Sequence, residues 1–194
     1  MRLPLLFSWP YVAAFVAVWV WAFWPEFRIV RRAQKEQTAT DAKSISVIVY
    51  GGGFLGGIAF FIAWWIPAQD QAHRLSMFVA GLLLIILGSL LRRHCFRMLG
   101  TSFTGDVRAR PDQEVVTRGA YSFLRHPSYT AGTLMNIGMG VALGSWYSAL
   151  LMLLTSFLVY GYRMSVEERV LATTIGEPYR QFMRTRKRLI PFVY

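Results

Sequence analysis

Two short polar clusters contain the side chains whose types and spacing could carry chemistry. The first runs from Arg125 to Tyr129 and reads Arg-His-Pro-Ser-Tyr, and the second contains Arg163, Glu167 and Glu168. Arg163 and Glu167 are four residues apart, so they share a face if one helix continues through both. The arginine could bind a carboxylate or a phosphate, and the glutamate could bind a cationic group or a pair of hydroxyl groups.

The first cluster has the features of an anion site at the start of a helix. Pro127 is suited to the first helical turn, and Arg125 and His126 would then lie beside backbone amides that attract anions. A small ligand with both an anionic and a cationic group would suit the two clusters together. Taken singly, each charge also has a structural explanation, because arginines anchor helix ends at membranes and Glu167 could pair on a solvated helix.

Several other kinds of site are disfavoured. The three histidines are dispersed and there is one cysteine, Cys95, so we expect no metal. No Gly-x-Ser-x-Gly sequence supports a hydrolase. The glycines from Gly51 to Gly53 lack the basic residue of a phosphate-binding loop. The net charge of +11 could suit nucleic acid, but long apolar stretches leave no soluble basic domain to bind it.

Apolar stretches long enough to cross a bilayer dominate the chain, which is 55% hydrophobic and 16% charged. About 20 apolar residues span the roughly 30 Å of hydrocarbon in a membrane. The uncharged run 127–162 is too long for one crossing, and Gly144 and Ser145 offer a turn near its middle. We predict an all-α integral membrane protein with about five transmembrane helices, at 3–25, 45–66, 75–91, 128–143 and 146–163. The first is expected to be retained and not removed as a signal peptide.

The segments between the spans are polar and mainly basic. We expect a loop or short surface helix over 26–43, turns and short helices over 98–125, and short surface helices in the last 31 residues. The span 45–66 contains five glycines that could allow close helix packing, and these are Gly51, Gly52, Gly53, Gly56 and Gly57.

Nearly all lysines and arginines outside the spans fall on one side of this arrangement. The positive-inside rule then places the N-terminus outside the cell membrane and the C-terminus in the cytoplasm. Both polar clusters fall on the cytoplasmic side. We divide the chain into a three-span membrane region, 1–99, and a C-terminal region with the active site, 100–194, and we expect a monomer.

The C-terminal half resembles the isoprenylcysteine carboxyl methyltransferase family. The resemblance depends on the run from Gly119 to Tyr129, the hydrophobic hairpin, the spacing Arg163-x3-Glu167-Glu168, and the sequence from Gly176 to Tyr179. Phospholipid N-methyltransferases and membrane sterol reductases share this signature more loosely. The resemblance implies S-adenosylmethionine as the methyl donor, with S-adenosylhomocysteine as the product. The chain has no glycine fingerprint of a Rossmann fold, in which a dinucleotide would bind.

The family's functional positions can be transferred to this sequence. Those that match its cofactor-binding positions are Gln113, Glu114, Val115, Val116, Tyr121, His126, Pro127, Ser128, Tyr129 and Glu167. A histidine of the family is replaced by Gln113. The resemblance implies that Arg163 holds the acceptor's carboxylate and that Glu167 is the acid that contacts the cofactor.

The predicted reaction is methyl transfer to the carboxylate of a lipidated acceptor such as prenylcysteine, which enters from the bilayer among membrane lipids. A carboxylate is ionised at pH 7, so no general base is needed. A phospholipid N-methyltransferase is the alternative, and its amine acceptor would need a base such as His126. A sterol reductase is disfavoured by the small number of spans. A non-catalytic membrane scaffold or pore component is a further alternative and would bind no cofactor.

Overall fold

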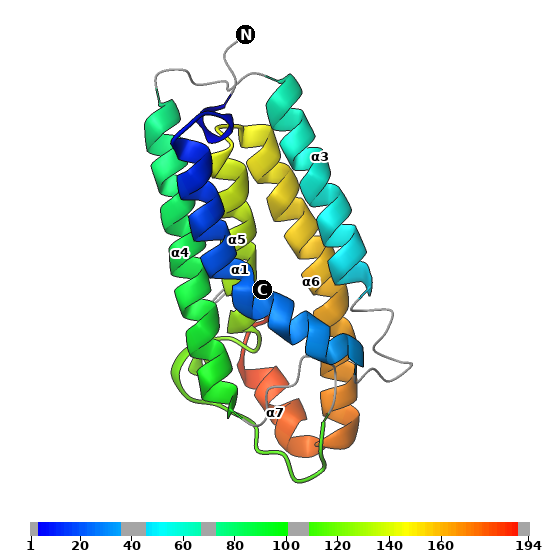
Figure 1. Ribbon diagram of the computed structural model, residues 1–194. Helices are drawn as coiled ribbons and strands as arrows, with labels where there is room; N and C mark the ends of the chain where they lie inside the picture. The colour runs from blue at the N-terminus through cyan, green and yellow to red at the C-terminus, as the bar shows by residue number, and fades with distance from the viewer. Residues whose placement is uncertain (1–3, 36–45, 67–72, 101–108, 190–194) are drawn as a thin grey trace.

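The protein is a bundle of long helices, shown by a computed structural model that describes residues 4–35, 46–66, 73–100 and 109–189 (Figure 1). The long helices are α1 (Tyr11–Lys35), α3 (Gly52–Trp65), α4 (Arg74–Leu99), α5 (Pro127–Ala142) and α6 (Trp146–Thr174). The shorter ones are η1 (Leu5–Phe7), the π-helical turn η2 (Val47–Gly51), η4 (Gly119–Ser122) and α7 (Glu177–Thr185). The described residues form no named strand, so the predicted all-α class is confirmed.

Four of the described helices are long and apolar enough to cross a membrane. They are the segments Tyr11–Ile29, Val47–Trp65, Arg74–Leu99 and Trp146–Thr174. The fifth predicted span, α5, has 16 residues, or about 24 Å of helix, and is therefore shorter than the hydrocarbon layer. The membrane class is confirmed, while the count of five crossings and the orientation stay predictions.

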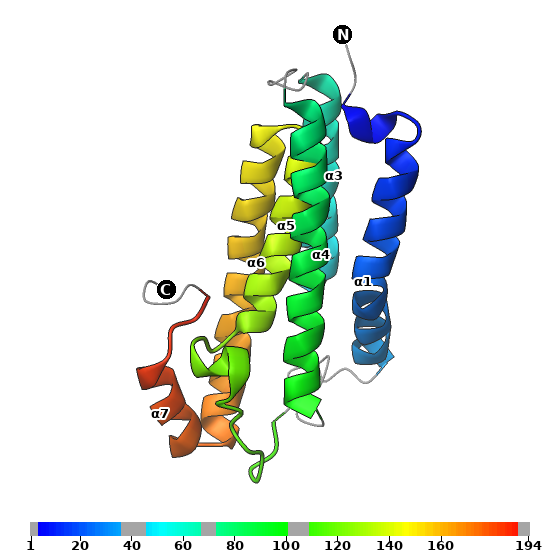
Figure 2. The same ribbon diagram turned by 90° about the vertical axis from the view of Figure 1, so that its left-hand side faces the viewer.

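Helices α4, α5 and α6 pack closely because glycines lie where they meet. A Cβ atom added at Gly81 of α4 would lie 2.4 Å from the backbone nitrogen of Ala142 on α5. One added at Gly140 of α5 would lie 2.4 Å from the Cα atom of Ala149 on α6. Backbone atoms cannot move aside as a flexible side chain can, so these three helices form a rigid unit. Figure 2 shows α4 and α5 side by side over most of their length.

The glycines of α3 have a different role from the predicted one. A Cβ atom added at Gly52, Gly53 or Gly57 would meet no described atom within 4 Å, and at Gly56 it would meet only the Met152 side chain at 3.7 Å. Within the described chain these glycines therefore do not bring helices into close contact, although their spacing would allow it. Small-residue spacing permits a close approach but does not require one. The close approaches come from glycines of α4 and α5.

Helix α1 is attached along α4 by hydrogen bonds, and it contacts α3 through aromatic side chains. The Ser89 hydroxyl of α4 donates to the Ala22 carbonyl at 3.2 Å, and Nη2 of Arg93 donates to the Trp21 carbonyl at 2.5 Å. The Phe15 and Phe60 rings lie 6.3 Å apart, centroid to centroid, and join α1 to α3. In Figure 1 the last part of α1 turns away from the direction of its first part. Pro25 lies inside this helix and removes one backbone hydrogen bond, which accounts for a bend.

Three helices extend beyond the predicted ends of their spans. Helix α1 continues through Pro25, where a surface segment was predicted, and α4 continues beyond residue 91 to Leu99. Helix α6 continues beyond residue 163 to Thr174, so the start of the predicted surface tail belongs to a long helix. The predictions were wrong here because they ended each span at its first charges. Charged groups that pair within the protein do not end a helix, and α6 ends only before Gly176, whose φ is +80°.

The predicted hairpin is confirmed. Gly144 has a φ of +69° and forms the turn, and the Ser145 hydroxyl accepts a hydrogen bond from the Ser148 amide at 3.2 Å as the N-cap of α6. Helix α5 begins at Pro127, at the end of the bundle where α6 carries Arg163 and Glu167. The two polar clusters therefore lie at the same end.

The surroundings of Gly81 and Gly57 predict that substitution by alanine will affect stability differently at these two positions. Gly81→Ala should lower the free energy of unfolding by about 1–3 kcal/mol, because the new methyl group would overlap the α5 backbone. Gly57→Ala, where no described atom is near, should change it by less than about 1 kcal/mol. Thermal or denaturant unfolding in detergent measures both, and equal losses would contradict the packing described here.

Candidate active site

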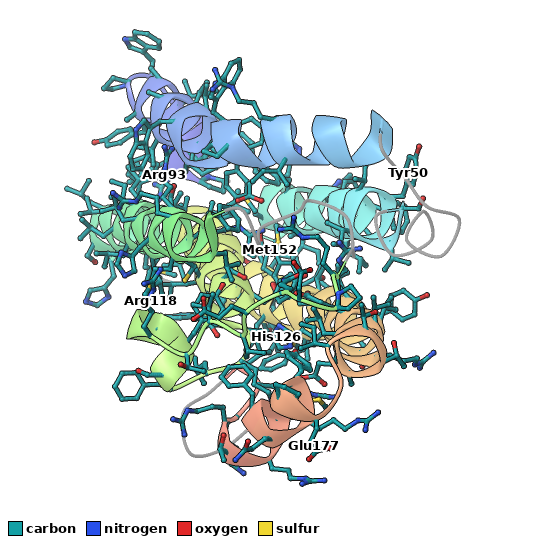
Figure 3. All side chains as sticks on the ribbon, turned by 90° about the horizontal axis from the view of Figure 1, so that it is seen from below. Tyr50, Arg93, Arg118, His126, Met152 and Glu177 are labelled. Carbon is teal, nitrogen blue, oxygen red and sulfur yellow. The ribbon has the colours of Figure 1, made fainter. Side chains whose placement is uncertain are left out.

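A cavity of about 600 Å³ opens among the helices at the end of the bundle that carries the two polar clusters. Helices α1, α3, α4, α5, α6 and α7 all contribute to its walls, as does the segment 113–116. Figure 3 looks into the bundle from this end and shows His126 close to the centre of the view. Residues from both predicted regions, 1–99 and 100–194, therefore line the cavity. The division of the chain into these two regions stays a prediction.

One tyrosine in the cavity wall, Tyr129, contacts both a cationic and an anionic side chain. The Tyr129 hydroxyl of α5 donates to Oε2 of Glu167 on α6 at 2.8 Å, and the Arg163 side chain also hydrogen bonds with this tyrosine. Arg163 is 5% exposed, and all three residues line the cavity. The predicted spacing on α6 therefore does place Arg163 and Glu167 together. This pair can bind opposite charges of one ligand or of two adjacent ligands.

The neighbouring Glu168 is the centre of a buried network of ion pairs. Its Oε1 atom lies 2.8 Å from Nη1 of Arg125 and 3.1 Å from Nε2 of His126. Its Oε2 atom lies 2.6 Å from Nη2 of Arg188, and the carboxylate is 3% exposed. Because a buried carboxylate needs partners to offset its lost hydration, these three groups fix its position. Glu168 was noted as part of the cluster, but the sequence did not reveal its partners.

Residues 186–189, which we call the C-terminal strap, lie against the start of α5. The Arg125 amide donates to the Lys187 carbonyl at 2.8 Å, and the His126 amide donates to the Arg188 carbonyl at 3.1 Å. The Thr130 hydroxyl donates to the Leu189 carbonyl at 2.7 Å. In Figure 2 the chain after α7 returns toward the base of α5. The strap was not predicted, because sequence patterns do not reveal a pairing between such short segments.

A second ion pair also lines the cavity. Nη2 of Arg92 on α4 donates to Oε2 of Glu26 on α1 at 2.8 Å, and Nε of Arg92 donates to the other oxygen of this carboxylate. Nη1 of Arg92 donates to the Ser128 carbonyl at 2.5 Å. This arginine therefore connects α1 with the His-Pro-Ser-Tyr sequence. The sequence prediction missed both residues, although opposite charges at the ends of two predicted spans were an available signal.

The predicted cofactor-binding residues are gathered around this cavity with one exception. Its lining includes Gln113, Glu114, Val115, Val116, Tyr121, His126, Ser128, Tyr129 and Glu167. Pro127 is not in the lining and is instead a buried residue in the first turn of α5. Tyr121 hydrogen bonds with the Ser128 side chain, and burial raises the pKa of the Tyr121 hydroxyl, so this group stays protonated near neutral pH.

The charged groups of the cavity lie at one end, and its lining along α6 beyond Arg163 is uncharged, with Thr155 and Ser156 among apolar residues. From Arg163 it continues past Val159 to Met152, which is about 16 Å at 1.5 Å per residue. Trp19 and Phe23 of α1 and the open glycine face of α3 line the same part. Among the described residues, no group of three or more histidine, cysteine, aspartate or glutamate side chains could hold a metal ion. The cavity therefore suits a charged group at one end and a hydrocarbon chain at the other.

The fold and the cavity together define an integral membrane protein that can hold a polar ligand beside a lipid. Residues 76–177 match a family model described as phospholipid methyltransferase. Protein-S-isoprenylcysteine O-methyltransferase B of Arabidopsis thaliana is 31% identical to this chain over 154 residues, which is 78% of this chain and 73% of that protein. The chain belongs to the isoprenylcysteine O-methyltransferase family, and this membership confirms the predicted resemblance and class of enzyme.

Two further comparisons agree. Protein-S-isoprenylcysteine O-methyltransferase of Tribolium castaneum is 28% identical over 173 residues, which is 87% of this chain and 61% of that protein. The solved structure of a eukaryotic intramembrane Ras methyltransferase, isoprenylcysteine carboxyl methyltransferase, aligns with a TM-score of 0.71 at 23% identity. That alignment covers 97% of this chain and 70% of the other, and it shows that the fold is shared.

The ion pair between Glu26 and Arg92 gives a stability prediction. Glu26→Ala should lower the free energy of unfolding by about 1–3 kcal/mol, because it leaves Arg92, whose side chain is 13% exposed, without its carboxylate partner. Arg184→Ala, which removes an exposed pair with Glu177, should cost less than about 1 kcal/mol. Denaturant unfolding in detergent compares the two variants. A loss for Glu26→Ala as small as that for Arg184→Ala would show that this pair does not hold α1 on α4.

Proposed function

We propose that this protein transfers a methyl group from S-adenosylmethionine to the carboxylate of a lipidated acceptor such as a prenylcysteine. One observation carries the proposal: a single cavity contains Arg163, Glu167 and Tyr129 at its polar end and continues into an uncharged, mainly apolar channel. Membership of the isoprenylcysteine O-methyltransferase family supports the same reaction. A scaffold or pore component would need neither feature.

The polar end fits the chemical groups of S-adenosylmethionine. This cofactor has an ammonium, a carboxylate, a ribose and a sulfonium, whose methyl group is the one transferred when it is bound. The Glu167 carboxylate suits a cationic or hydroxyl group. The Tyr129 ring lies 5.6 Å from the His126 ring and 5.1 Å from the Tyr160 ring, centroid to centroid, and aromatic faces attract cations. We assign cofactor binding to this wall and to residues 113–116.

Arg163 favours a carboxylate acceptor. A guanidinium can orient a carboxylate through two hydrogen bonds and remains charged while buried. Because the acceptor is already ionised at neutral pH, the chain has only to remove water from it and align it with the methyl group. No base is required for this reaction, and two of the titratable groups in the cavity wall already have partners. Nε2 of His126 faces Glu168, and Glu167 accepts from Tyr129.

Phospholipid N-methylation is the second candidate, and the description of the matching family model is the observation that favours it. In that reaction Arg163 would bind the lipid phosphate. The ammonium of the acceptor would have to lose a proton before attack, so a base would be needed. We rank this reaction below methyl ester formation, because the relative that is 31% identical over 78% of this chain is an isoprenylcysteine O-methyltransferase.

We also propose that the acceptor's lipid tail reaches the cavity between α1 and α3. Phe7 and Trp64, with ring centroids 5.2 Å apart, join η1 to one end of α3. Toward the polar end, Gly53 and Gly57 leave open space beside the cavity. We place the polar end in the cytoplasm, as basic residues favour, so that the cofactor comes from water and the tail from the bilayer.

The roles assigned to Arg163 and Glu167 are tested by replacing each residue with alanine. The first substitution is Arg163→Ala. This variant should lower kcat/KM for a prenylcysteine analogue by at least 100-fold and weaken S-adenosylmethionine binding by less than fivefold, because Arg163 orients the acceptor. Glu167→Ala should abolish cofactor binding measured by calorimetry in detergent. Lys187→Gln, an exposed side chain outside the cavity, is the control. If the wild-type protein binds no S-adenosylmethionine, the proposed function is wrong.

The proposed route of the tail is tested by a bulky residue on the open face of α3. Gly57→Phe should raise KM for the prenyl acceptor about tenfold and leave cofactor affinity unchanged, because its ring would fill the channel and not the polar end. Gly161→Phe is the matched control, since Gly161 also has open space around it but does not line the cavity. Equal KM values for the two variants would contradict this route.

A further inference from the structure

We propose that Arg188 of the C-terminal strap is a positioning residue, which acts through Glu168 to set the orientation of the His126 ring. The inference rests on the proposed function, because it assumes that His126 forms part of the cofactor-binding wall. It adds a role for a residue that is outside the cavity lining and that the sequence did not suggest. Three observations support it.

The first observation is that Arg188 contacts both oxygens of the Glu168 carboxylate. Arg125 and His126 contact only Oε1, at 2.8 and 3.1 Å. Arg188 contacts Oε2 through Nη2 at 2.6 Å and through Nε at 3.1 Å, and its Nε also lies 3.3 Å from Oε1. A carboxylate held at one oxygen can still rotate about its last bond, whereas contacts at both oxygens fix its plane. Arg188 therefore determines the direction in which Oε1 faces His126.

The second observation is that Arg188 reaches His126 by two routes. Its carbonyl accepts a hydrogen bond from the His126 amide at 3.1 Å, while its guanidinium holds the carboxylate that contacts His126 Nε2. The adjacent Leu189 is 3% exposed, and its carbonyl accepts from the Thr130 hydroxyl. The strap is thus fixed on both sides of Arg188. Backbone and side chain of His126 are constrained by the same residue.

The third observation links His126 to the cavity. The His126 side chain is 4% exposed and lines the cavity, and its ring lies beside Tyr129, which donates to Glu167. A rotated His126 ring would change the wall at the place assigned to the cofactor. Glu167 and Glu168 therefore have separate roles, since one faces the cavity and its neighbour holds the motif in place.

A double-mutant cycle distinguishes this role from a purely structural one. Arg188→Gln should weaken S-adenosylhomocysteine binding about tenfold, measured by calorimetry in detergent. In a His126→Asn background the same substitution should weaken binding less than twofold, because the group through which Arg188 acts is gone. Arg188→Lys keeps the charge but not the two-point contact, so it should give a smaller loss. If Arg188→Gln does not fold, Arg188→Lys takes its place in the cycle.

A second readout reports on His126 directly. The chain has three histidines, so the ring-nitrogen signals of His126 can be assigned by comparison with His126→Asn. Arg188→Gln should shift these signals and leave those of His73 and His94 unchanged. Lys187→Gln, which removes the adjacent charge but keeps the strap backbone, should change neither the signals nor the affinity.

Two results would overturn the proposal. One is an equal loss of affinity from Arg188→Gln in both backgrounds, which would mean that Arg188 only stabilises the fold. The other is an unchanged His126 signal together with wild-type affinity. Wild-type protein that fails to bind S-adenosylhomocysteine would instead count against the proposed function, so the two failures are distinguishable.

Discussion

The buried Glu168 carboxylate and its three partners, two arginines and a histidine, are the constraint on which the site depends. Burying a carboxylate is costly unless hydrogen-bond donors replace water, and here the donors come from two other parts of the chain. Arg125 and His126 precede α5, Arg188 follows α7, and Glu168 belongs to α6. The network therefore joins the start of one helix of the hairpin to the extended end of the other. Glu167, one residue earlier, is left to face the cavity.

Two kinds of glycine explain how a rigid bundle can contain a lipid-sized cavity. Gly81 and Gly140 bring backbones into contact and make α4, α5 and α6 a close-packed unit. Gly53 and Gly57 of α3 touch no described atom within 4 Å at the Cβ position, and they line the cavity. The same residue type thus closes the bundle on one side and leaves space on the other. The proposed route of the acceptor's tail uses this open side, while the charged site belongs to the close-packed side.

The sequence predicted the elements with a strong local signal. The lengths of the apolar stretches predicted the long helices, and Gly144 and Ser145 predicted the turn. The distribution of lysines and arginines predicted that both polar clusters lie at one end of the bundle. Helix ends were missed, because Glu168 and its neighbours continue α6 by pairing within the protein. The pairing of Arg188 with Glu168 and that of Glu26 with Arg92 were also missed, since the two residues of each pair lie far apart in the sequence. Contacts of this kind depend on tertiary packing and leave no periodic pattern.

The central claim is that Arg163 directs methyl transfer to a carboxylate, and the identity of the product tests it most directly. Purified protein should be supplied with S-adenosylmethionine labelled in its methyl group, and with a prenylcysteine analogue or phosphatidylethanolamine in separate reactions. The account predicts that label enters the prenylcysteine analogue as a methyl ester, which mild base releases as volatile methanol. Base-stable label in phosphatidylethanolamine, with none in the prenylcysteine analogue, would contradict it.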